Sequence, residues 1–371
     1  MNTETILDEI EKKIAKVHTQ SLDLSFNELL SMYQSGELNI APSYQRLFRW
    51  SEGARSRFIE SLILEMPVPP IYVIETEDGV YDLIDGLQRF SSYLHLRGEL
   101  ISNHMDIDKG DFLTLSDCDI ILSLNGMKYE DLPLSLKIKL KRSFIRVEVI
   151  RRGSDNRFKY HMFKRLNTGG EELTPQQIRN CTIRMLDNKF NQFIIDLSKE
   201  HDFKNCIDNI SESQKLGSFG EELVLRYFAF KNFRDKFKHD VADFMTDYME
   251  LVTNNEIEFN YPENKDNFMK VFKLFSVSFG DKIFGKIGKN DKLQSSFGIY
   301  HYESICIGIQ CVINNIDTDN QNHINEFKKT LIKLKKDSDF KKETTGGGKN
   351  SPGLLKRRID ISEYYFKEMK L

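Results

Sequence analysis

The segment Leu83–Arg89 combines residue types that suit phosphate chemistry. A strand that ends in a glycine turn and continues into a helix leaves free backbone N–H groups at the helix start, where the helix dipole is positive. Gly86 permits a backbone shape that a side chain would obstruct, and Arg89 on the first helical turn can make a bidentate contact with phosphate oxygens. Asp85 at the strand end could bind Mg²⁺ or orient a water molecule. The local sequence alone favours a plainer alternative, in which Asp85 caps the helix and Arg89 pairs with a surface carboxylate.

A second cluster places arginine and amide side chains beside aromatic rings. Tyr44, Gln45 and Arg46 are followed shortly by Trp50, the single tryptophan of the chain. This combination suits a nucleotide, because a guanidinium can bind phosphate and an aromatic ring can stack on a base. The alternative is that the rings anchor the following helix on the core, and for Trp50 we favour that interpretation.

A third cluster is a polar turn, rich in glycine, that precedes an expected helix start. Its residues are Asn167, Thr168, Gly169 and Gly170, and Thr174 follows as a helix cap. The turn could close over a bound ligand, or its glycines could simply end the preceding helix. Each of the three clusters is weak evidence by itself.

Helix caps and periodicity predict the elements that position these clusters. In the N-terminal part we expect one helix capped by Ser25 and closed by Gly36, and another capped by Ser51 and stopped by the prolines from Pro67 onward. The second of these helices is expected to turn one apolar face inward, formed by Phe58, Ile59, Leu62, Ile63 and Met66.

Two β-rich runs, Ile71–Glu75 and Tyr81–Ile84, flank an Asp-Gly turn and predict a hairpin. The helix expected at Gln88–Leu96 follows directly, and a further strand is expected at Ile145–Ile150. After Thr174, Pro175 and a glutamine three residues beyond the cap predict another clean helix start.

At 371 residues the chain is too long for one small core, so we expect at least two packed units. Beyond about Leu186 apolar residues recur at helical spacing and strand signals are few. The 27 phenylalanines are expected to fill the core of this helical half. The predicted fold class is therefore α+β, with an α/β domain over residues 1–185 and an all-helical domain over residues 186–371.

The net charge of −3 argues against a protein that binds DNA by its overall charge. Two local basic runs are interpreted as solvated helix faces, with contact to a phosphate backbone as the alternative. They consist of Lys137, Lys139, Lys141 and Arg142, and of Lys333, Lys335 and Lys336.

Five scattered cysteines without a Cys-x-x-Cys pair argue against a disulfide framework and a structural zinc site. We expect buried free thiols in a reducing cytosol, with Cys306 and Cys311 in the core. The apolar stretches are too short to span a bilayer, and the first residues lack the apolar region of a signal peptide. A cytoplasmic location without a membrane partner is therefore expected.

Taken in order, the three clusters resemble the successive motifs of the GmrSD-type restriction N-terminal family, which is related to ParB and sulfiredoxin. The matching residues are Tyr44-Gln45-Arg46 with Trp50, Asp85-Gly86-Leu87-Gln88-Arg89, and Phe163 through Leu166-Asn167-Thr168-Gly169-Gly170 to Leu173-Thr174. Glu221–Arg226 and the glycine-rich loop before Arg357-Arg358-Ile359 are similar to the helical half of that family. The resemblance covers almost the whole chain, and the ordered combination is its specific part.

The resemblance implies a ParB/sulfiredoxin-like N-terminal domain that binds and hydrolyses a nucleoside triphosphate with a divalent metal such as Mg²⁺. By position, Asp85 would bind the metal or orient water, Arg89 would bind phosphate, and Gln88 would be a polar contact within the catalytic motif. The remaining nucleotide contacts implied by the resemblance are Tyr44, Gln45, Arg46, Gly86, Asn167, Thr168 and Gly169.

Two departures from the family pattern bear on function. Leu87 stands where the usual Asp-Gly-Gln-Gln-Arg motif has its first glutamine, which affects turnover more than binding. Gly169 stands where the family has an arginine, so one cation is missing. The eight histidines show no His-Asn-His spacing, so we expect a separate nuclease partner. A DNA-binding or DNA-cleaving protein and a non-catalytic scaffold of the same fold are the alternatives.

Overall fold

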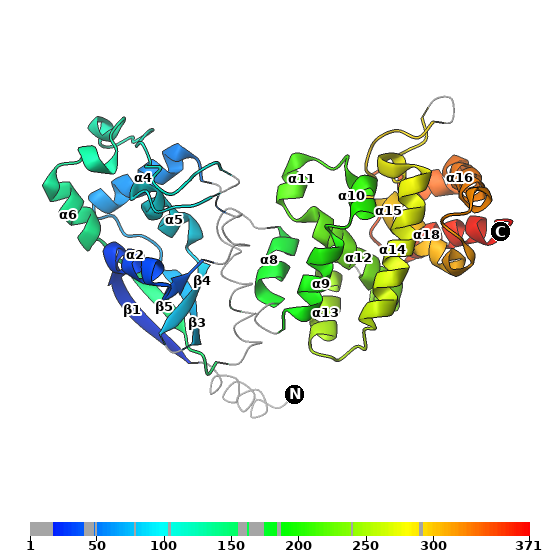
Figure 1. Cartoon of the computed structure of the whole chain (residues 1–371), viewed down its shortest axis with the longest axis horizontal. Helices are drawn as coiled ribbons and strands as arrows, with labels where there is room; N and C mark the ends of the chain where they lie inside the picture. The colour runs from blue at the N-terminus through cyan, green and yellow to red at the C-terminus, as the bar shows by residue number, and fades with distance from the viewer. Residues whose placement is uncertain are drawn as a thin grey trace. The chain divides into compact units, whose positions relative to one another are not determined.

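The computed structural model of the chain describes residues 18–40, 48, 50–77, 79–102, 105–154, 162, 174–183, 187–238, 240–288 and 292–371. The chain divides into two compact units, Met1–Leu173 and Thr174–Leu371 (Figure 1). The sequence also predicts an amphipathic helix at the N-terminus and a helix near Asn156–Leu166. Both lie outside the described residues, apart from residue 162. A mixed α+β chain, with a sheet near the N-terminus and helices after it, is confirmed.

The first unit contains a five-stranded mixed sheet with the strand order β1-β5-β3-β4-β2. The β3–β4 hairpin is antiparallel as predicted, and β5 runs parallel to β3 on its other side. The outer strand β1 is antiparallel to β5, and the short β2 is parallel to β4. The strands are β1 (Thr19–Ser25), β2 (Leu38–Asn39), β3 (Ile71–Glu77), β4 (Val80–Asp85) and β5 (Phe144–Ile150).

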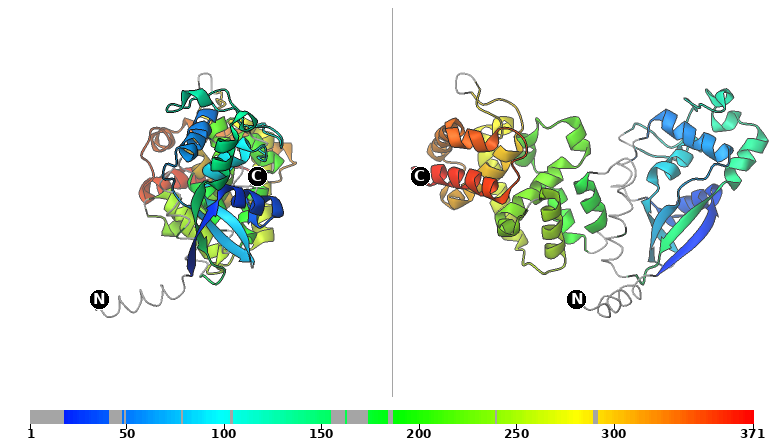
Figure 2. Two further views of the ribbon diagram at one scale, coloured as in Figure 1. Left: turned by 90° about the vertical axis from the view of Figure 1, so that its left-hand side faces the viewer. Right: turned by 180° about the vertical axis from the view of Figure 1, so that it is seen from behind.

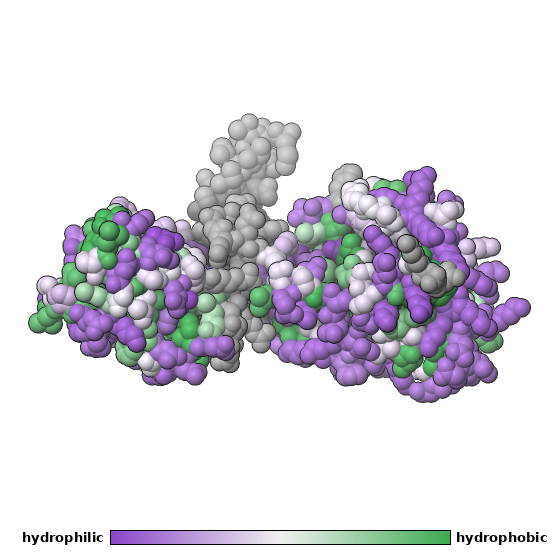
Figure 3. Space-filling view, turned by 90° about the horizontal axis from the view of Figure 1, so that it is seen from above, coloured by the Kyte–Doolittle hydropathy of each residue, from purple (hydrophilic) through white to green (hydrophobic). Residues whose placement is uncertain are grey.

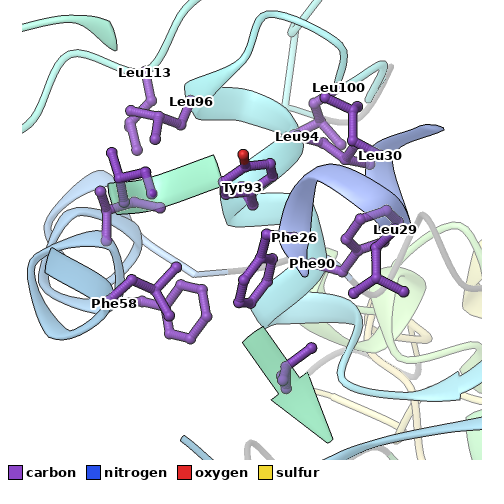
Figure 4. Close-up of a cluster of buried hydrophobic side chains, with 14 of the residues drawn as sticks. Phe26, Leu29, Leu30, Phe58, Phe90, Tyr93, Leu94, Leu96, Leu100 and Leu113 are labelled. Atoms are coloured by element: carbon purple, nitrogen blue, oxygen red, sulfur yellow. The ribbon is translucent and has the colours of Figure 1, made fainter. Parts of the chain in front are cut away.

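Aromatic and aliphatic side chains from the helices of this unit form its core (Figure 4). Phe26 lies at its centre, with ring centroids 5.0 Å from Tyr93 and 6.0 Å from Phe58. The helices that supply these side chains are α2 (Phe26–Ser35), α4 (Glu52–Ile63), α5 (Leu87–Leu96) and α6 (Leu134–Arg142).

The predicted caps account for where α2 and α4 begin. The Ser25 side chain accepts a hydrogen bond from the Glu28 N–H, and Ser51 accepts one from the Ala54 N–H. Gly36 closes α2 in the left-handed conformation, as expected. These confirmed caps fix the residues at which α2 and α4 begin.

The inward-facing position predicted for Met66 is wrong. The helix α4 ends at Ile63, before the prolines, and Glu65 adopts a positive φ of 57°. Helical spacing therefore no longer applies at Met66, whose side chain is 42% exposed. The other four predicted residues of that face are buried in the core of the unit: Phe58, Ile59, Leu62 and Ile63.

The described part of the second unit consists mainly of helices, as the right-hand view in Figure 2 shows. Phenylalanine rings pack throughout its core, and Phe268 and Phe272 have centroids 4.4 Å apart. The helices are α8 (Pro175–Thr182), α9 (Lys189–Leu197), α10 (His201–Ile207), α11 (Glu212–Leu216), α12 (Phe219–Phe233), α13 (Val241–Thr253), α14 (Tyr261–Ser278), α15 (Ile299–Gly308), α16 (Gln321–Lys336), α17 (Ser338–Thr344) and α18 (Pro352–Lys367).

Two predictions for this unit need correction. Cys306 is buried, but Cys311 is exposed, because α15 ends at Gly308 and a 3₁₀ turn carries Cys311 out of the core. Lys335 is not part of a solvated face: it is 1% exposed and donates to the carbonyls of Ile283 and Gly285 at 2.7 and 2.5 Å. Burial lowers its pKa to about 7.

The visible surface of each unit is mostly hydrophilic, with smaller hydrophobic patches (Figure 3). Among the helices that the structure describes, none combines the length and the apolar character needed to cross a membrane.

Candidate functional site

The segment from Asp85 to Arg89 forms the predicted strand–turn–helix. The strand β4 ends at Asp85, Gly86 is the N-cap residue, and α5 begins at Leu87. Gly86 has no side chain with which to accept a hydrogen bond from the first turn, so no side chain caps α5. The start of α5 therefore carries the positive end of the helix dipole without a capping oxygen.

Gly86 is required by both backbone conformation and space. Its φ of 99° lies in the left-handed region, which residues other than glycine rarely adopt. A Cβ atom at this position would lie 2.3 Å from Cγ2 of Ile71 on the neighbouring strand. The turn can approach β3 this closely only without a side chain.

Arg89 and Asp85 form an ion pair across the turn, with Nη2 of the arginine 2.8 Å from Oδ2 of the aspartate. Their side chains are 15% and 30% exposed, and Nε of Arg89 is buried without a hydrogen-bond partner among the described residues. The alternative in which Asp85 caps the helix is wrong, because Gly86 is the N-cap. Arg89 does pair with a carboxylate, but this carboxylate is the other charged residue of the motif.

The flanking residues of the motif point in different directions. Oε1 of Gln88 accepts a hydrogen bond from the Trp50 N–H at 3.2 Å, so the amide contacts the protein backbone. Leu87 is partly buried and packs against the hydrophobic core of the first unit. The residue that replaces the usual glutamine is therefore used in packing.

Trp50 anchors the start of α4, as favoured from the sequence. Its ring packs edge-on against Phe58, with centroids 5.9 Å apart. Its carbonyl oxygen accepts a hydrogen bond from Nε of Arg55 at 3.0 Å, and Nη1 of Arg55 lies 2.7 Å from Nδ1 of His95. Arg55 and His95 are only 3% and 5% exposed.

The environment of this pair shifts both pKa values. Burial and the neighbouring Arg55 lower the pKa of His95 to about 4, and burial lowers the pKa of Arg55. His95 is therefore neutral at pH 7, and its Nδ1 can accept a hydrogen bond from the guanidinium. The sequence analysis missed both residues. A signal was present, because Arg55 shares the inward helical face of Ile59 and Leu62.

The structure places four predicted site residues side by side: Asp85, Gly86, Gln88 and Arg89. The other six predicted contacts lie outside the described residues: Tyr44, Gln45, Arg46, Asn167, Thr168 and Gly169. The described residues contain no group of three or more His, Cys, Asp or Glu side chains placed to hold a metal ion. Asp85 can supply one oxygen ligand, so Mg²⁺ at this site would take its remaining ligands from phosphate and water.

The motifs in the helical unit form a buried ionic network. Glu303 accepts hydrogen bonds from Nη1 of Arg226 at 2.6 Å and from Nη2 of Arg358. Glu222 pairs with Arg226 at 2.9 Å and with Arg179 at 3.4 Å. Such a network fixes the arrangement of α8, α12, α15 and α18 more than it stabilises them. Glu303 was missed because it lies in an otherwise apolar stretch.

Comparison with protein families matches residues 26–184 to the N-terminal domain of the GmrSD restriction endonuclease. The matched segment contains the sheet strands β2 to β5 and the whole Asp85–Arg89 motif. The resemblance found in the motifs of the N-terminal part is thereby confirmed, and the similarity of the helical half, beyond residue 184, stays a prediction. No curated protein and no solved structure matches the chain.

Proposed function

Because residues 26–184 match the N-terminal domain family of the GmrSD restriction endonuclease, we infer that the protein is related to restriction and phage defence. From this premise we propose that the protein binds and hydrolyses a nucleoside triphosphate as a component of a bacterial modification-dependent restriction or phage-defence system. It acts with a separate nuclease in this proposal, and its first unit has the ParB/sulfiredoxin-like fold.

One observation carries the proposal: Arg89, paired with Asp85, lies on the first turn of a helix that no side chain caps. Nη2 is engaged by Asp85, and the Arg89 side chain is 15% exposed. A phosphate could accept hydrogen bonds from the exposed part of the guanidinium and from the backbone N–H groups at the helix start. The geometry thus suits a phosphate better than a plain helix start.

Asp85 has the properties of the proposed metal ligand and water-orienting group. Its side chain is 30% exposed, and only one of its oxygens is engaged by Arg89. Bound Mg²⁺ would neutralise charge on the phosphates. In this arrangement Asp85 holds the cation near the phosphate while Arg89 binds the phosphate oxygens, and the contacts proposed for residues 44–46 and 167–169 complete the nucleotide site.

Leu87 favours a second candidate function, in which the protein binds nucleotide without hydrolysing it. Its side chain packs on the core and offers no polar atom at the first turn of α5. Such a protein would act as a nucleotide-dependent scaffold. The two candidates differ in phosphate release and not in affinity.

The test is isothermal titration of the full chain with ATP, GTP, CTP and UTP in Mg²⁺, followed by phosphate-release assays with each nucleotide that binds. Arg89→Ala is expected to weaken binding by about 1.5–3 kcal/mol, since it removes a charge-assisted contact. Asp85→Ala should reduce phosphate release more than affinity. Arg146→Ala is the matched control, because it breaks another Arg–Asp pair of the same unit, with Asp23.

Each outcome separates the candidates. Binding without phosphate release would select the scaffold. Normal binding and hydrolysis by both Arg89→Ala and Asp85→Ala would refute the site assignment. Absence of binding to all four nucleotides would refute the proposed function and leave the DNA-contacting alternative.

A further inference from the structure

We propose that Arg55 is a positioning residue for the anion site at the start of α5, because it fixes the backbone that Gln88 contacts. The inference rests on the function proposed above and extends its site to α4 and to the last turn of α5. Neither Arg55 nor His95 belongs to the motifs that the resemblance supplied.

Both backbone polar groups of Trp50 are held by side chains. Its N–H donates to Oε1 of Gln88 at 3.2 Å, and its carbonyl accepts from Nε of Arg55 at 3.0 Å. These contacts connect the residue before the cap of α4 to the first turn of α5. A displacement of Trp50 would therefore displace Gln88, which is adjacent to Arg89.

The guanidinium of Arg55 is itself fixed on two further sides. Its Nη1 lies 2.7 Å from Nδ1 of His95, and its Cζ lies 5.2 Å from the ring centroid of the buried Phe48. His95 lies seven positions after Gln88 on α5, which is the same helical face. Arg55 is thus connected to the last turn of α5 directly through His95, and to its first turn through Trp50 and Gln88.

The chemistry of Arg55 argues against a role in stability alone. It forms no ion pair with any residue that the structure describes, although its side chain is almost completely buried. A buried cation without a paired carboxylate is destabilising relative to an apolar side chain of similar size. Its planar fork, however, can hold a carbonyl and an imidazole nitrogen in a fixed relation, which an aliphatic side chain cannot do.

The experiment compares Arg55→Lys with Glu60→Gln in the full chain. Lysine keeps the charge but lacks the fork, so we expect at least a tenfold loss of affinity for the nucleotide that the parent binds best. Glu60 is a matched control, because it lies on the same helix, is 2% exposed and accepts from the N–H groups of Ile120 and Ile121, away from Trp50. The Glu60→Gln variant should retain the nucleotide affinity of the parent, even if its unfolding midpoint falls by as much as that of Arg55→Lys.

The single tryptophan gives an independent readout. In Arg55→Lys, acrylamide should quench Trp50 fluorescence more strongly than in the parent, and the fluorescence anisotropy should be lower. In Glu60→Gln both quantities should match the parent. His95→Gln retains an acceptor for Nη1 of Arg55 and should keep most of the nucleotide affinity. His95→Leu lacks this acceptor and should bind the nucleotide more weakly, as Arg55→Lys does. These His95 variants decide the question if Arg55→Lys does not fold.

Parent-like affinity and parent-like Trp50 emission in Arg55→Lys and His95→Leu would overturn the positioning role and leave the proposed function intact. Affinity losses that follow the unfolding midpoints equally in Arg55→Lys and Glu60→Gln would also overturn it. Absence of nucleotide binding by the parent would overturn the proposed function, and the positioning role with it.

Discussion

The ion pair between Arg89 and Asp85 contributes little to the stability of the first unit. Pairs spaced four residues apart on a helix surface contribute about 0.3–0.5 kcal/mol, whereas a buried donor without a partner costs about 1–3 kcal/mol. The ion pair therefore does not compensate for burying Nε without a partner among the described residues, so stability alone does not explain the placement of Arg89.

Gly86→Ala is expected to destabilise the first unit and to abolish nucleotide binding. A non-glycine residue at a positive φ costs roughly 1–3 kcal/mol, and overpacking against Ile71 adds roughly 1–3 kcal/mol. Relief of the clash would also move the first turn of α5. Urea unfolding followed by Trp50 emission and nucleotide titration would measure both effects.

Gly79→Ala provides the control for backbone strain. Gly79 also has a positive φ, of 79°, but a Cβ there would meet no atom within 4 Å. In this variant the free energy of unfolding should fall only by the contribution of backbone strain, and the nucleotide affinity should stay that of the parent. Equal losses in the two variants would show that the close approach to Ile71 is unimportant.

His301 in the second unit is expected to make the protein sensitive to acid. It is 4% exposed, its Nδ1 has no partner, and burial followed by the charges of Lys335 and Lys286 lowers its pKa to about 3. The unfolded chain, with an ordinary pKa of about 6.5, therefore binds more protons than the folded chain as pH falls below that value. Folding stability should decrease by about 2 kcal/mol between pH 6.5 and pH 5 through this residue.

His301→Leu should remove that part of the pH dependence. Urea unfolding at pH 7 and pH 5 gives the slope of the free energy of unfolding against pH for parent and variant. Circular dichroism is used to follow unfolding, because Trp50 lies in the other unit. The His301→Leu variant should retain a pH dependence of similar size from His95, whose pKa is also lowered, to about 4. An identical slope in parent and variant would contradict the assignment of His301 as a buried neutral group.

At the scale of elements, local signals predicted the parts of the fold that local chemistry controls. Ser25, Ser51 and Thr174 cap the helices that they were expected to cap, and the hairpin before Asp85 has the predicted pairing. Helix caps and hairpin turns depend on neighbours within a few residues, so the sequence specifies them directly.

The errors occur where a contact joins distant segments or where a helix ends early. Arg55 and His95 meet across 40 positions, and Lys335 reaches carbonyls 50 and 52 positions away. Periodicity places such residues on a face but does not identify their partners. For the candidate site, the sequence predicted the residues of the α5 turn but not the Arg55–His95 pair behind it.

The cap of α8 allows an element-scale prediction. The Thr174 hydroxyl accepts from the Gln177 N–H at 3.2 Å and lies 2.7 Å from the Gly217 carbonyl, to which it donates. Thr174→Ala should therefore lower the free energy of unfolding of the second unit by about 1–2 kcal/mol. Thr174→Ser retains the hydroxyl and should lose less than about 0.5 kcal/mol, the usual range for harmless substitutions. Denaturation followed by circular dichroism would decide, and equal losses would indicate that the methyl group matters more than the cap.

At the scale of the whole molecule, the distribution of charge bears on the DNA-acting alternative. The net charge is −3, and the two basic runs present fewer free cations than their sequences indicate. Lys137 pairs with Glu130 at 3.3 Å, Lys139 pairs with Glu65 at 3.0 Å, and Lys335 is buried. Of the cations in the first run, Lys141 and Arg142 form no ion pair with a described acid.

A duplex contacted through the first run would thus release the counterions of about two phosphates. Because the slope of log K against log salt is about −0.9 per phosphate neutralised, we expect a slope no steeper than about −2. Fluorescence anisotropy of a labelled duplex between about 50 and 200 mM salt would measure it, with the Lys141→Ala/Arg142→Ala double variant as control. A slope typical of about six or more contacts would show that cations outside these runs build a DNA surface, and would favour the DNA-acting alternative over a nucleotide-dependent partner of a nuclease.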